Sequence, residues 1–430
     1  MIILDTALAK RLAAGNPIRV GMVGAGYMAR GIALQILTAM PGIRLVAISN
    51  RTPAQAERAY RDAGAEVSGS VADGGALDAA IRAGRYVVTD DPMLLCRSGP
   101  IEAIIETTGE VEFGSQVALE AIRNGKHVIL MNAEVDASIG PILKVYADRA
   151  GVVYTYTDGD EPGVAMNLLR FVDSMGYRPV LTGQIKGFLD HYRNPETQRG
   201  FAEKYQQKAA MVASFADGSK LALESAIIGN ATGFVPGKRG MYGHTCAHVK
   251  DLLQKFDVAE FANGGMVDFV LGAEPHTGAF VMAYNDHPVK KKYMAYFKFG
   301  EGPLYMFYTP YHLPHMQLPH SVARAVLFAD PTLTPRGAPV CDTVAVAKRD
   351  LKAGERLDGM GGFTCYGLVD RYETLRAEDA LPMALSVDCR LKRDIAKDQP
   401  IRNQDVELPP GRTCDRLRAE QTAHFAGKRA

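Results

Sequence analysis

The chain has 430 residues, of which 47% are hydrophobic and 23% are charged, and its formal net charge is +1. A chain of this length is expected to form two or three domains, and its near-neutral charge indicates neither a nucleic-acid partner nor a membrane surface. No apolar run is long enough to cross a bilayer. The six cysteines form no C-x-x-C motif, which favours reduced thiols in a cytoplasmic protein.

After a predicted N-terminal amphipathic helix (MIILDTALAKRLAAG), a glycine-rich turn joins a strand to a helix. Ile18–Gly31 reads IRVGMVGAGYMARG, an apolar strand followed by a G-x-G-x-x-A turn and a helix expected over Gly31–Met40. Gly24 permits the tight turn, and Gly26 lets backbone N–H groups approach a pyrophosphate. A purely structural glycine turn is the alternative. The residues of this turn expected at a dinucleotide cofactor are Gly24, Gly26, Tyr27 and Met28.

The second strand, Arg44–Ser49, ends in a segment without an acidic residue. An NAD-preferring site usually has Asp or Glu here, which accepts hydrogen bonds from the ribose hydroxyls. This chain offers Asn50 and Arg51 instead, and an arginine suits the additional phosphate of NADP. We therefore expect NADP as the cofactor, with a solvated loop arginine as the alternative.

Further apolar runs predict the remaining strands of a parallel sheet. They are Ile101–Thr107, His127–Leu130 and Val152–Tyr156, with a helix expected over Gln116–Asn124. Ligands of open α/β sheets bind at the carboxyl ends of the strands. Thr107, Gly109 and Asn132 follow two of these ends, so we expect them on the nicotinamide side.

An acidic turn, Asp158–Gly163, precedes a helix expected over Ala165–Met175. Acidic residues at this position stabilise the helix N-terminus. They could equally bind a divalent cation or a polar group of a substrate. Asp160 and Glu161 are therefore candidate site residues.

The pattern changes after Tyr177. Arg178–Thr182, Lys208–Phe215 and Lys220–Ile228 are predicted as strands of a second sheet, with a hairpin turn at Asp217-Gly218. A polar loop follows, with Lys238, Arg239, His244 and His248. The two histidines could bind a metal, but no acid lies between them, so ordinary surface is favoured.

The end of the chain contains a strand-like segment, a helix and a separate unit. GPLYMFYTPYHL predicts a strand and a turn, and Ser321–Phe328 a short helix that returns to the first domain. Pro331–Pro339 has the composition of a linker. Two similar phrases follow, Ala345–Glu355 and Leu391–Ile401, which indicate a small β-rich domain with internal pseudo-symmetry.

Several motifs carry a family resemblance. GKHVILMNAE and the glycine turn resemble homoserine-dehydrogenase-like Rossmann oxidoreductases, although Ala133 stands where that group has a lysine. The terminal phrases resemble the SAF domain, a β-clip module. Together with GDEP, FADGSK, NATGFVPG, PYHL and the VARAVL helix, the chain resembles the SAF-containing, homoserine-dehydrogenase-like family, which includes 1-deoxyxylulose 5-phosphate reductoisomerase-like enzymes.

The resemblance implies an α/β chain with three consecutive domains. These are a Rossmann domain (1–157), a central α+β catalytic and dimerisation domain (158–335) and a SAF-like domain (336–430). GDEP implies that Asp160 and Glu161 form an acidic site, and Lys186 matches a lysine of a family segment that reads roughly G-K-G-K-N-N-P. Here that segment reads GQIKGFLDHYRNP, and the loop from Lys238 also departs from the family pattern.

The first functional hypothesis is an NADP-dependent oxidoreductase or reductoisomerase acting on a small sugar or polyol phosphate. Asp160 and Glu161, with Glu224, would hold Mg²⁺ or Mn²⁺, and Lys186 would act as acid or base. The substrate phosphate would bind to Lys238, Arg239 and His244. The alternatives are a dehydrogenase of a branched sugar or hydroxy acid without rearrangement, and a non-catalytic dinucleotide-binding sensor or assembly protein. We expect a cytoplasmic homo-oligomer with a small-molecule substrate.

Overall fold

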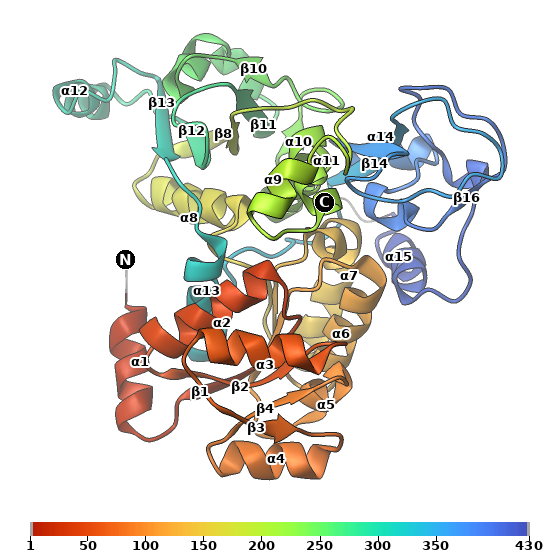
Figure 1. Ribbon diagram of the computed structural model, residues 1–430. Coiled ribbons are helices and arrows are strands. Elements are labelled where there is room, and N and C mark those ends of the chain that lie inside the picture. Colours follow the sequence, from red (N-terminus) through yellow and green to blue (C-terminus); the bar gives the residue numbers. More distant parts are fainter. Residues whose placement is uncertain (1–2, 428–430) are drawn as a thin grey trace. The chain divides into compact units, whose positions relative to one another are not determined.

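The computed structural model describes residues 3–427 and divides the chain into two compact units (Figure 1). The first unit comprises the chain up to Asp160, Leu313–Thr334 and Arg412–His424. The second comprises Glu161–His312, Pro335–Gly411 and the residues after His424. The three consecutive domains stay a prediction, because these two units are each built from separated segments.

The first unit contains a seven-stranded parallel sheet with the order β3-β4-β2-β1-β5-β6-β7. The predicted strands are present, with small shifts at their ends. Because the strand order reverses between β1 and β5, their carboxyl ends form the place where an open α/β sheet binds its ligand. The strands are β1 (Ile18–Val23), β2 (Ile43–Ser49), β3 (Val67–Ser70), β4 (Tyr86–Thr89), β5 (Ala103–Glu106), β6 (His127–Leu130) and β7 (Tyr154–Tyr156).

Helices connect these strands, and two arrive from distant parts of the sequence. Ile32 and Ile36 of α2 form one core with Val20 of β1 and with Leu318 and Val322 of α13, so α13 belongs to the first unit. The helices are α1 (Leu4–Ala13), α2 (Tyr27–Ala39), α3 (Pro53–Asp62), α4 (Gly74–Arg82), α5 (Pro92–Arg97), α6 (Val111–Arg123), α7 (Ala133–Ala150), α13 (Pro314–Phe328) and α15 (Thr413–His424). Met1 and Ile2 of the predicted N-terminal helix lie outside the described residues.

The second unit contains a mixed sheet in which the strands follow the order β10-β11-β8-β12-β13, with β9 paired to β11. The strands are β8 (Arg178–Lys186), β9 (Val235–Pro236), β10 (His244–Thr245), β11 (Met266–Leu271), β12 (Ala279–Tyr284) and β13 (Leu304–Thr309). Its helical elements are α8 (Glu161–Ser174), α9 (Arg199–Lys204), α10 (Ala209–Asp217), α11 (Ser219–Thr232), α12 (Pro288–Tyr296), η1 (Val249–Gln254) and η2 (Val258–Phe261).

Two predicted strands of this unit were wrong. Lys208–Phe215 and Lys220–Ile228 lie in the helices α10 and α11. Gly218 has φ +85° and joins the two helices, so Asp217-Gly218 is a helix-to-helix turn and no hairpin. Every residue of α11 except Lys220 is buried, and a helix buried all round lacks the polar face whose period distinguishes it from a strand.

The β-rich segment after Pro335 has the pseudo-symmetry that its two phrases predict. Leu351 and Ile395, which are equivalent in the phrases, exchange antiparallel backbone hydrogen bonds of 2.8 and 3.0 Å. Asp350 accepts from the Lys397 amide, and Asp394 accepts from the Ala353 amide, both at 2.9 Å. The elements are β14 (Cys341–Ala347), β15 (Cys365–Arg371), α14 (Tyr372–Ala377), η3 (Met383–Ser386), β16 (Arg390–Leu391), η4 (Asn403–Asp405) and β17 (Val406–Glu407). Among the described residues, no helix is both long and apolar enough to cross a membrane.

Candidate active site

The glycine turn has the geometry that a dinucleotide pyrophosphate requires. Gly24 has φ +110°, and a Cβ there would lie 2.6 Å from Thr107 Oγ1, so only glycine fits this turn. Gly26 begins α2 without a side-chain cap, and a Cβ on it would meet no described atom within 4 Å. The first N–H groups of α2 therefore face open space and are available to phosphate oxygens. Tyr27, in the first turn of α2, is 43% exposed, and Met28 is half-buried.

The two residues expected to select the cofactor follow β2. The Asn50 side chain donates to the Thr52 carbonyl at 2.9 Å, which fixes the turn. Arg51 is exposed and forms no ion pair with any residue from 3 to 427. Its guanidinium is therefore available to an anionic ligand.

The remaining predicted cofactor residues lie after β5 and β6. Thr107 donates from its hydroxyl to the Val23 carbonyl at 2.9 Å, which fastens the end of β5 to the end of β1. Gly109 has φ +68° in the same turn. Asn132 is fully buried and caps α7 by accepting from the Val135 amide. These three residues thus shape the carboxyl edge of the sheet.

A buried ion pair in the second unit joins the start of α8 to the end of β8. Glu161 begins α8, and its Oε1 lies 2.7 Å from Nζ of Lys186, the last residue of β8. Burial alone would raise the pKa of Glu161, but the charges of Lys186 and His312 hold it well below its usual range. Burial opposes the charge on Lys186, yet Glu161 and Glu224 outweigh this effect and raise the pKa of Lys186. Lys186 is therefore protonated at neutral pH.

A histidine lies on the other side of Glu161. His312 Nε2 is 3.6 Å from Glu161 Oε2, and His312 Nδ1 is 3.0 Å from the Thr277 hydroxyl. The side chains of Lys186 and His312 keep 19% and 28% of their surface exposed, so both can be reached by a small molecule. His312 belongs to the PYHL motif, but the sequence alone did not predict a role for it.

The predicted metal ligands have protein partners. Asp160, which precedes Glu161 in the chain, accepts from the Tyr156 hydroxyl at 2.6 Å. Glu224 in α11 is fully buried and lies 2.8 Å from Nζ of Lys220. A cation bound to Glu161 or Glu224 would have to compete with a lysine.

The predicted substrate loop divides into two parts. Arg239 donates to Asp370 at 2.8 Å and to both oxygens of Glu378 at 2.7 and 2.8 Å. Its donors thus fasten the β-rich segment, and a substrate phosphate would have to compete with these two carboxylates for Arg239. Lys238 lies over the Tyr242 ring at 5.4 Å, and His244 stacks on the same ring at 5.7 Å.

His248, the other histidine of the loop, has a structural role at the start of η1. It caps η1, where its Nδ1 accepts from the Lys250 amide at 3.0 Å and Asp251 completes a capping box. This capping role occupies Nδ1, so a metal could bind His248 only through Nε2.

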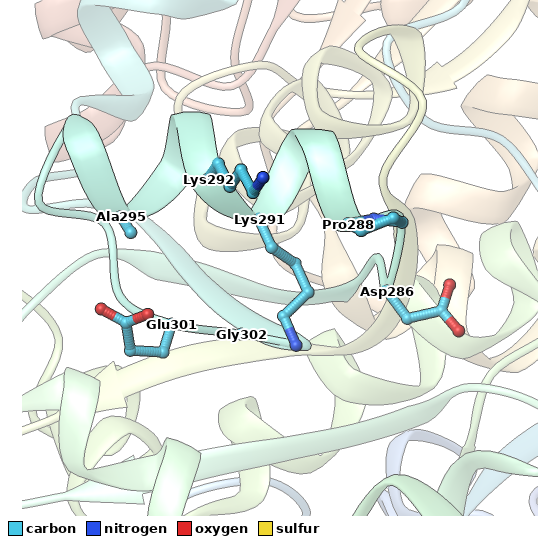
Figure 2. Close-up of a pocket in the computed structure, with 7 residues that line it drawn as sticks. All are labelled: Asp286, Pro288, Lys291, Lys292, Ala295, Glu301 and Gly302. Atoms are coloured by element: carbon cyan, nitrogen blue, oxygen red, sulfur yellow. The ribbon is translucent and has the colours of Figure 1, made fainter.

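A cavity of about 590 Å³ opens beside α12 (Figure 2). Figure 2 shows lysine and acidic side chains around it, and no predicted site residue is among them. The lining residues are Asp286, Pro288, Lys291, Lys292, Ala295, Glu301 and Gly302. The cavity is thus separate from the ion pair of Lys186.

Two family comparisons match consecutive parts of the chain. Residues 18–130 match the oxidoreductase family with an NAD-binding Rossmann fold. Residues 159–318 match the catalytic domain described as oxidoreductase DRL. A search of curated proteins finds no match.

Several solved structures are similar in fold. Homoserine dehydrogenase from Thiobacillus denitrificans is 14% identical over 90% of this chain and 98% of its own, with a TM-score of 0.43. Scyllo-inositol dehydrogenase from Lactobacillus casei is 17% identical over 62% of this chain and 74% of its own, with a TM-score of 0.38. An NAD-binding oxidoreductase from Klebsiella pneumoniae is 20% identical over 41% of this chain and 45% of its own, with a TM-score of 0.28.

Each of the two family matches covers one of the residue groups described above. The Rossmann match covers the glycine turn and the strand ends around it, and the catalytic-domain match contains Glu161, Lys186 and His312. The chain is therefore an NAD(P)-dependent oxidoreductase, with an NAD-binding Rossmann fold followed by a catalytic domain.

Proposed function

We propose that the protein transfers a hydride between NADP and a carbon that bears a hydroxyl or carbonyl group in a small polar substrate. The observation that carries this proposal is the buried pair of Glu161 and Lys186 with His312 beside it. An ammonium that is held charged and partly exposed is suited to donate a proton to a substrate oxygen.

The chain's residues supply the proton side of this reaction. When bound, the nicotinamide cofactor would supply the hydride for the carbonyl carbon. In reduction, Lys186 Nζ gives a proton to the carbonyl oxygen, which completes the alcohol. Because the pKa of Lys186 is raised, its neutral form is scarce at neutral pH, so reduction is the proposed direction, and oxidation, in which neutral Lys186 takes the hydroxyl proton, is expected at high pH. Glu161 orients the ammonium, and His312 contributes a second polar group on the same carboxylate.

NADP is the proposed cofactor because Asn50 and the unpaired Arg51 stand where an NAD site has an acid. We expect NADPH to bind more tightly than NADH. Replacing Arg51→Ala should reduce that difference by about tenfold, the scale of one charge-assisted contact. Fluorescence titration of both cofactors measures it, and an unchanged ratio in the variant would remove Arg51 from the site.

The proposed substrate class is a small sugar or polyol phosphate. Lys238 and His244, which share the Tyr242 ring, are the residues proposed for the phosphate now that Arg239 has other partners. A reductoisomerase acting on a 1-deoxyxylulose 5-phosphate-like ketose would add a carbon-skeleton rearrangement to the hydride transfer. A dehydrogenase without rearrangement is the second candidate, and product analysis distinguishes the two.

A divalent cation remains part of the proposal. Glu161 and His312 approach closely enough to bind one Mg²⁺ or Mn²⁺ together, with Asp160 adjacent in the chain. Such an ion would polarise the substrate oxygens. Turnover measured with and without chelator, at saturating NADPH, shows whether the reaction needs it.

The central experiment replaces Lys186→Met. We expect turnover to fall by about 10²–10⁴-fold because proton transfer is lost, while NADPH affinity stays within about twofold. The variant leaves Glu161 buried without its lysine, which costs about 3–5 kcal/mol of stability. The double variant Lys186→Met with Glu161→Gln should recover much of that stability and none of the turnover.

Lys348→Met is the matched control. Its side chain is 4% exposed, against 19% for Lys186, and its ammonium pairs with Asp217 at 2.7 Å in the same unit, but it belongs to no predicted site. We expect a similar loss of stability with nearly unchanged turnover in the folded protein. Equal turnover losses in the two lysine variants would contradict the catalytic role of Lys186.

A homo-oligomer is proposed as the working state. Figure 1 shows α12 standing apart from the sheet, and no residue of α12 is buried. Tyr293, Tyr296 and Phe297 are 61%, 77% and 68% exposed, an apolar group that a lone protein rarely shows. The chain runs from α12 into β13, an edge strand of the sheet. We propose that a second copy of the chain covers the exposed aromatic residues and this edge strand together. Light scattering at several concentrations tests this.

A further inference from the structure

A carboxyl group lies inside the first unit at the point where the cofactor edge of the sheet begins. Glu106 is the last residue of β5 and is fully buried. It is paired in register with Val23, the last residue of β1, and Gly24 of the glycine turn follows directly. Burying an acidic side chain is costly unless its oxygens are hydrogen-bonded; Oε1 of Glu106 is bonded, whereas its buried Oε2 has no hydrogen-bond partner among the described residues.

The carboxylate of Glu106 holds the turn that follows it. One oxygen accepts from the Thr108 amide at 2.8 Å and also from the Thr108 hydroxyl. Burial raises the pKa of Glu106, and the hydrogen bonds from Thr108 act against this rise. The side chain thus folds the Thr107–Gly109 turn back onto the end of its own strand.

The same turn is connected to the two neighbouring strands. Thr107 donates to the Val23 carbonyl at 2.9 Å. Asn132, after β6, donates to the Glu110 carbonyl at 3.3 Å. The ends of β1, β5 and β6 are therefore connected through this turn, and the Glu106 side chain bonds to the turn at Thr108.

A glycine in α6 makes room for this arrangement. A Cβ on Gly114 would lie 2.6 Å from Asn132 Nδ2 and 3.0 Å from Glu106 Oε2. The first distance is shorter than a Cβ contact tolerates and the second is tight, so α6 packs directly on the two side chains. Glu106 is thus enclosed by α6.

We propose that Glu106 is a positioning residue for the dinucleotide: through Thr108 it sets the conformation of the Thr107–Gly109 turn, and thereby the affinity of the carboxyl edge of the sheet for the nicotinamide end of the cofactor. The proposal rests on the proposed cofactor site. Glu106 itself touches no cofactor atom in this scheme.

The test compares NADPH affinities of the full-length protein and three variants, each with its melting temperature. Glu106→Leu removes the acceptor, and Thr108→Val removes one donor with little change of shape. Both should raise the NADPH dissociation constant by about tenfold or more. Glu106→Gln keeps an acceptor for Thr108 and should stay within about threefold of the wild type.

Thr155→Val is the control. Thr155 is buried in the same sheet, and its hydroxyl donates to the Leu333 carbonyl at 3.1 Å, away from the turn. We expect a lower melting temperature and an unchanged NADPH affinity. If Glu106→Leu fails to fold, Thr108→Val alone decides the question.

The outcomes separate this inference from the cofactor site itself. A wild-type protein that binds neither NADPH nor NADH contradicts the proposed function. A wild-type protein that binds NADPH, with Thr108→Val binding equally well, overturns the role of Glu106 and leaves the cofactor site intact. Equal losses of affinity in Thr108→Val and Thr155→Val would also overturn it, because they would indicate a general loss of stability.

Discussion

Asp136 is a second buried carboxyl group of the first unit, and it titrates near neutral pH. It is 2% exposed and accepts from the Tyr154 hydroxyl at 2.6 Å. Burial raises its pKa from 3.8 to about 7. Because the folded state holds the proton more tightly than the unfolded state, this group favours folding below about pH 4, and that contribution is lost as the pH rises towards 7.

We predict that Asp136→Asn removes this pH dependence. A shift of about three pKa units corresponds to roughly 4 kcal/mol between about pH 4 and pH 8. Asparagine cannot ionise, and its oxygen can accept from Tyr154 as before. Denaturant unfolding at a series of pH values should therefore show the variant gaining on the wild type as the pH rises. Parallel curves for the two proteins would mean that Asp136 is ionised in the folded state.

Residues of the site differ in how far the sequence reveals them. Gly24 and Gly26 were predicted because their requirement is local: a tight turn between a strand and a helix. His312 and Lys220 were missed because their partners, Glu161 and Glu224, matter only once the sheet and α11 are folded. The partners of Arg239 were missed for a related reason, since Asp370 and Glu378 lie far along the chain.

At the scale of elements, α2 and α13 depend on close contact. A Cβ on Gly31 of α2 would lie 2.9 Å from the His315 ring and 3.0 Å from its Cβ in α13. Gly159 has φ +84°, and a Cβ on it would lie 2.7 Å both from Gln317 Cβ and from the Leu313 carbonyl oxygen. The first turn of α13 therefore packs on both the cofactor helix and the acidic turn. Neither glycine was predicted to have this role, because α13 is remote in sequence.

We predict that Gly31→Ala destabilises the protein by about 1–3 kcal/mol. In an exposed helix the same change would stabilise the protein by about 0.5–1 kcal/mol. The sign of the change in unfolding free energy therefore shows whether α2 and α13 are in close contact at Gly31. The double variant Gly31→Ala with His315→Ala should recover most of the loss. Gly74→Ala in α4, where a Cβ meets no described atom within 4 Å, is the control. If denaturant unfolding shows that Gly31→Ala is more stable than the wild type, α13 moves away from the added Cβ at little cost in free energy.

The elements that the sequence predicted well share one property. Strands β1, β2 and β6 are short apolar runs with turn residues on both sides, so composition alone identifies them. In α10 apolar residues occupy nearly every position, and in α11 polar and apolar residues alternate irregularly, so the pattern favours neither structure. Their identity depends on packing, which a local reading of the sequence does not contain.

At the scale of the whole molecule, the chain order and the structural units differ. The first unit takes its last helix, α15, from the end of the chain. Gln421 of α15 accepts from the Ile142 amide of α7 at 3.2 Å, and Glu420 accepts from the Tyr146 hydroxyl at 2.5 Å. A chain ended near Ala338, at the predicted linker, would therefore remove a helix from the cofactor unit as well as the β-rich segment.

Leu417 of α15 provides the sharper test of this interleaving. It is fully buried, so Leu417→Ala should cost about 2–5 kcal/mol. That loss should appear in the cofactor unit, although Leu417 lies within the predicted SAF-like domain. NADPH raises the melting temperature of whatever unfolds with its site, so calorimetry with and without NADPH identifies that transition. Leu408→Ala, at a residue 43% exposed, is the control with little expected effect. If Leu417→Ala lowers only the melting temperature of a transition that NADPH does not shift, α15 is part of the other unit.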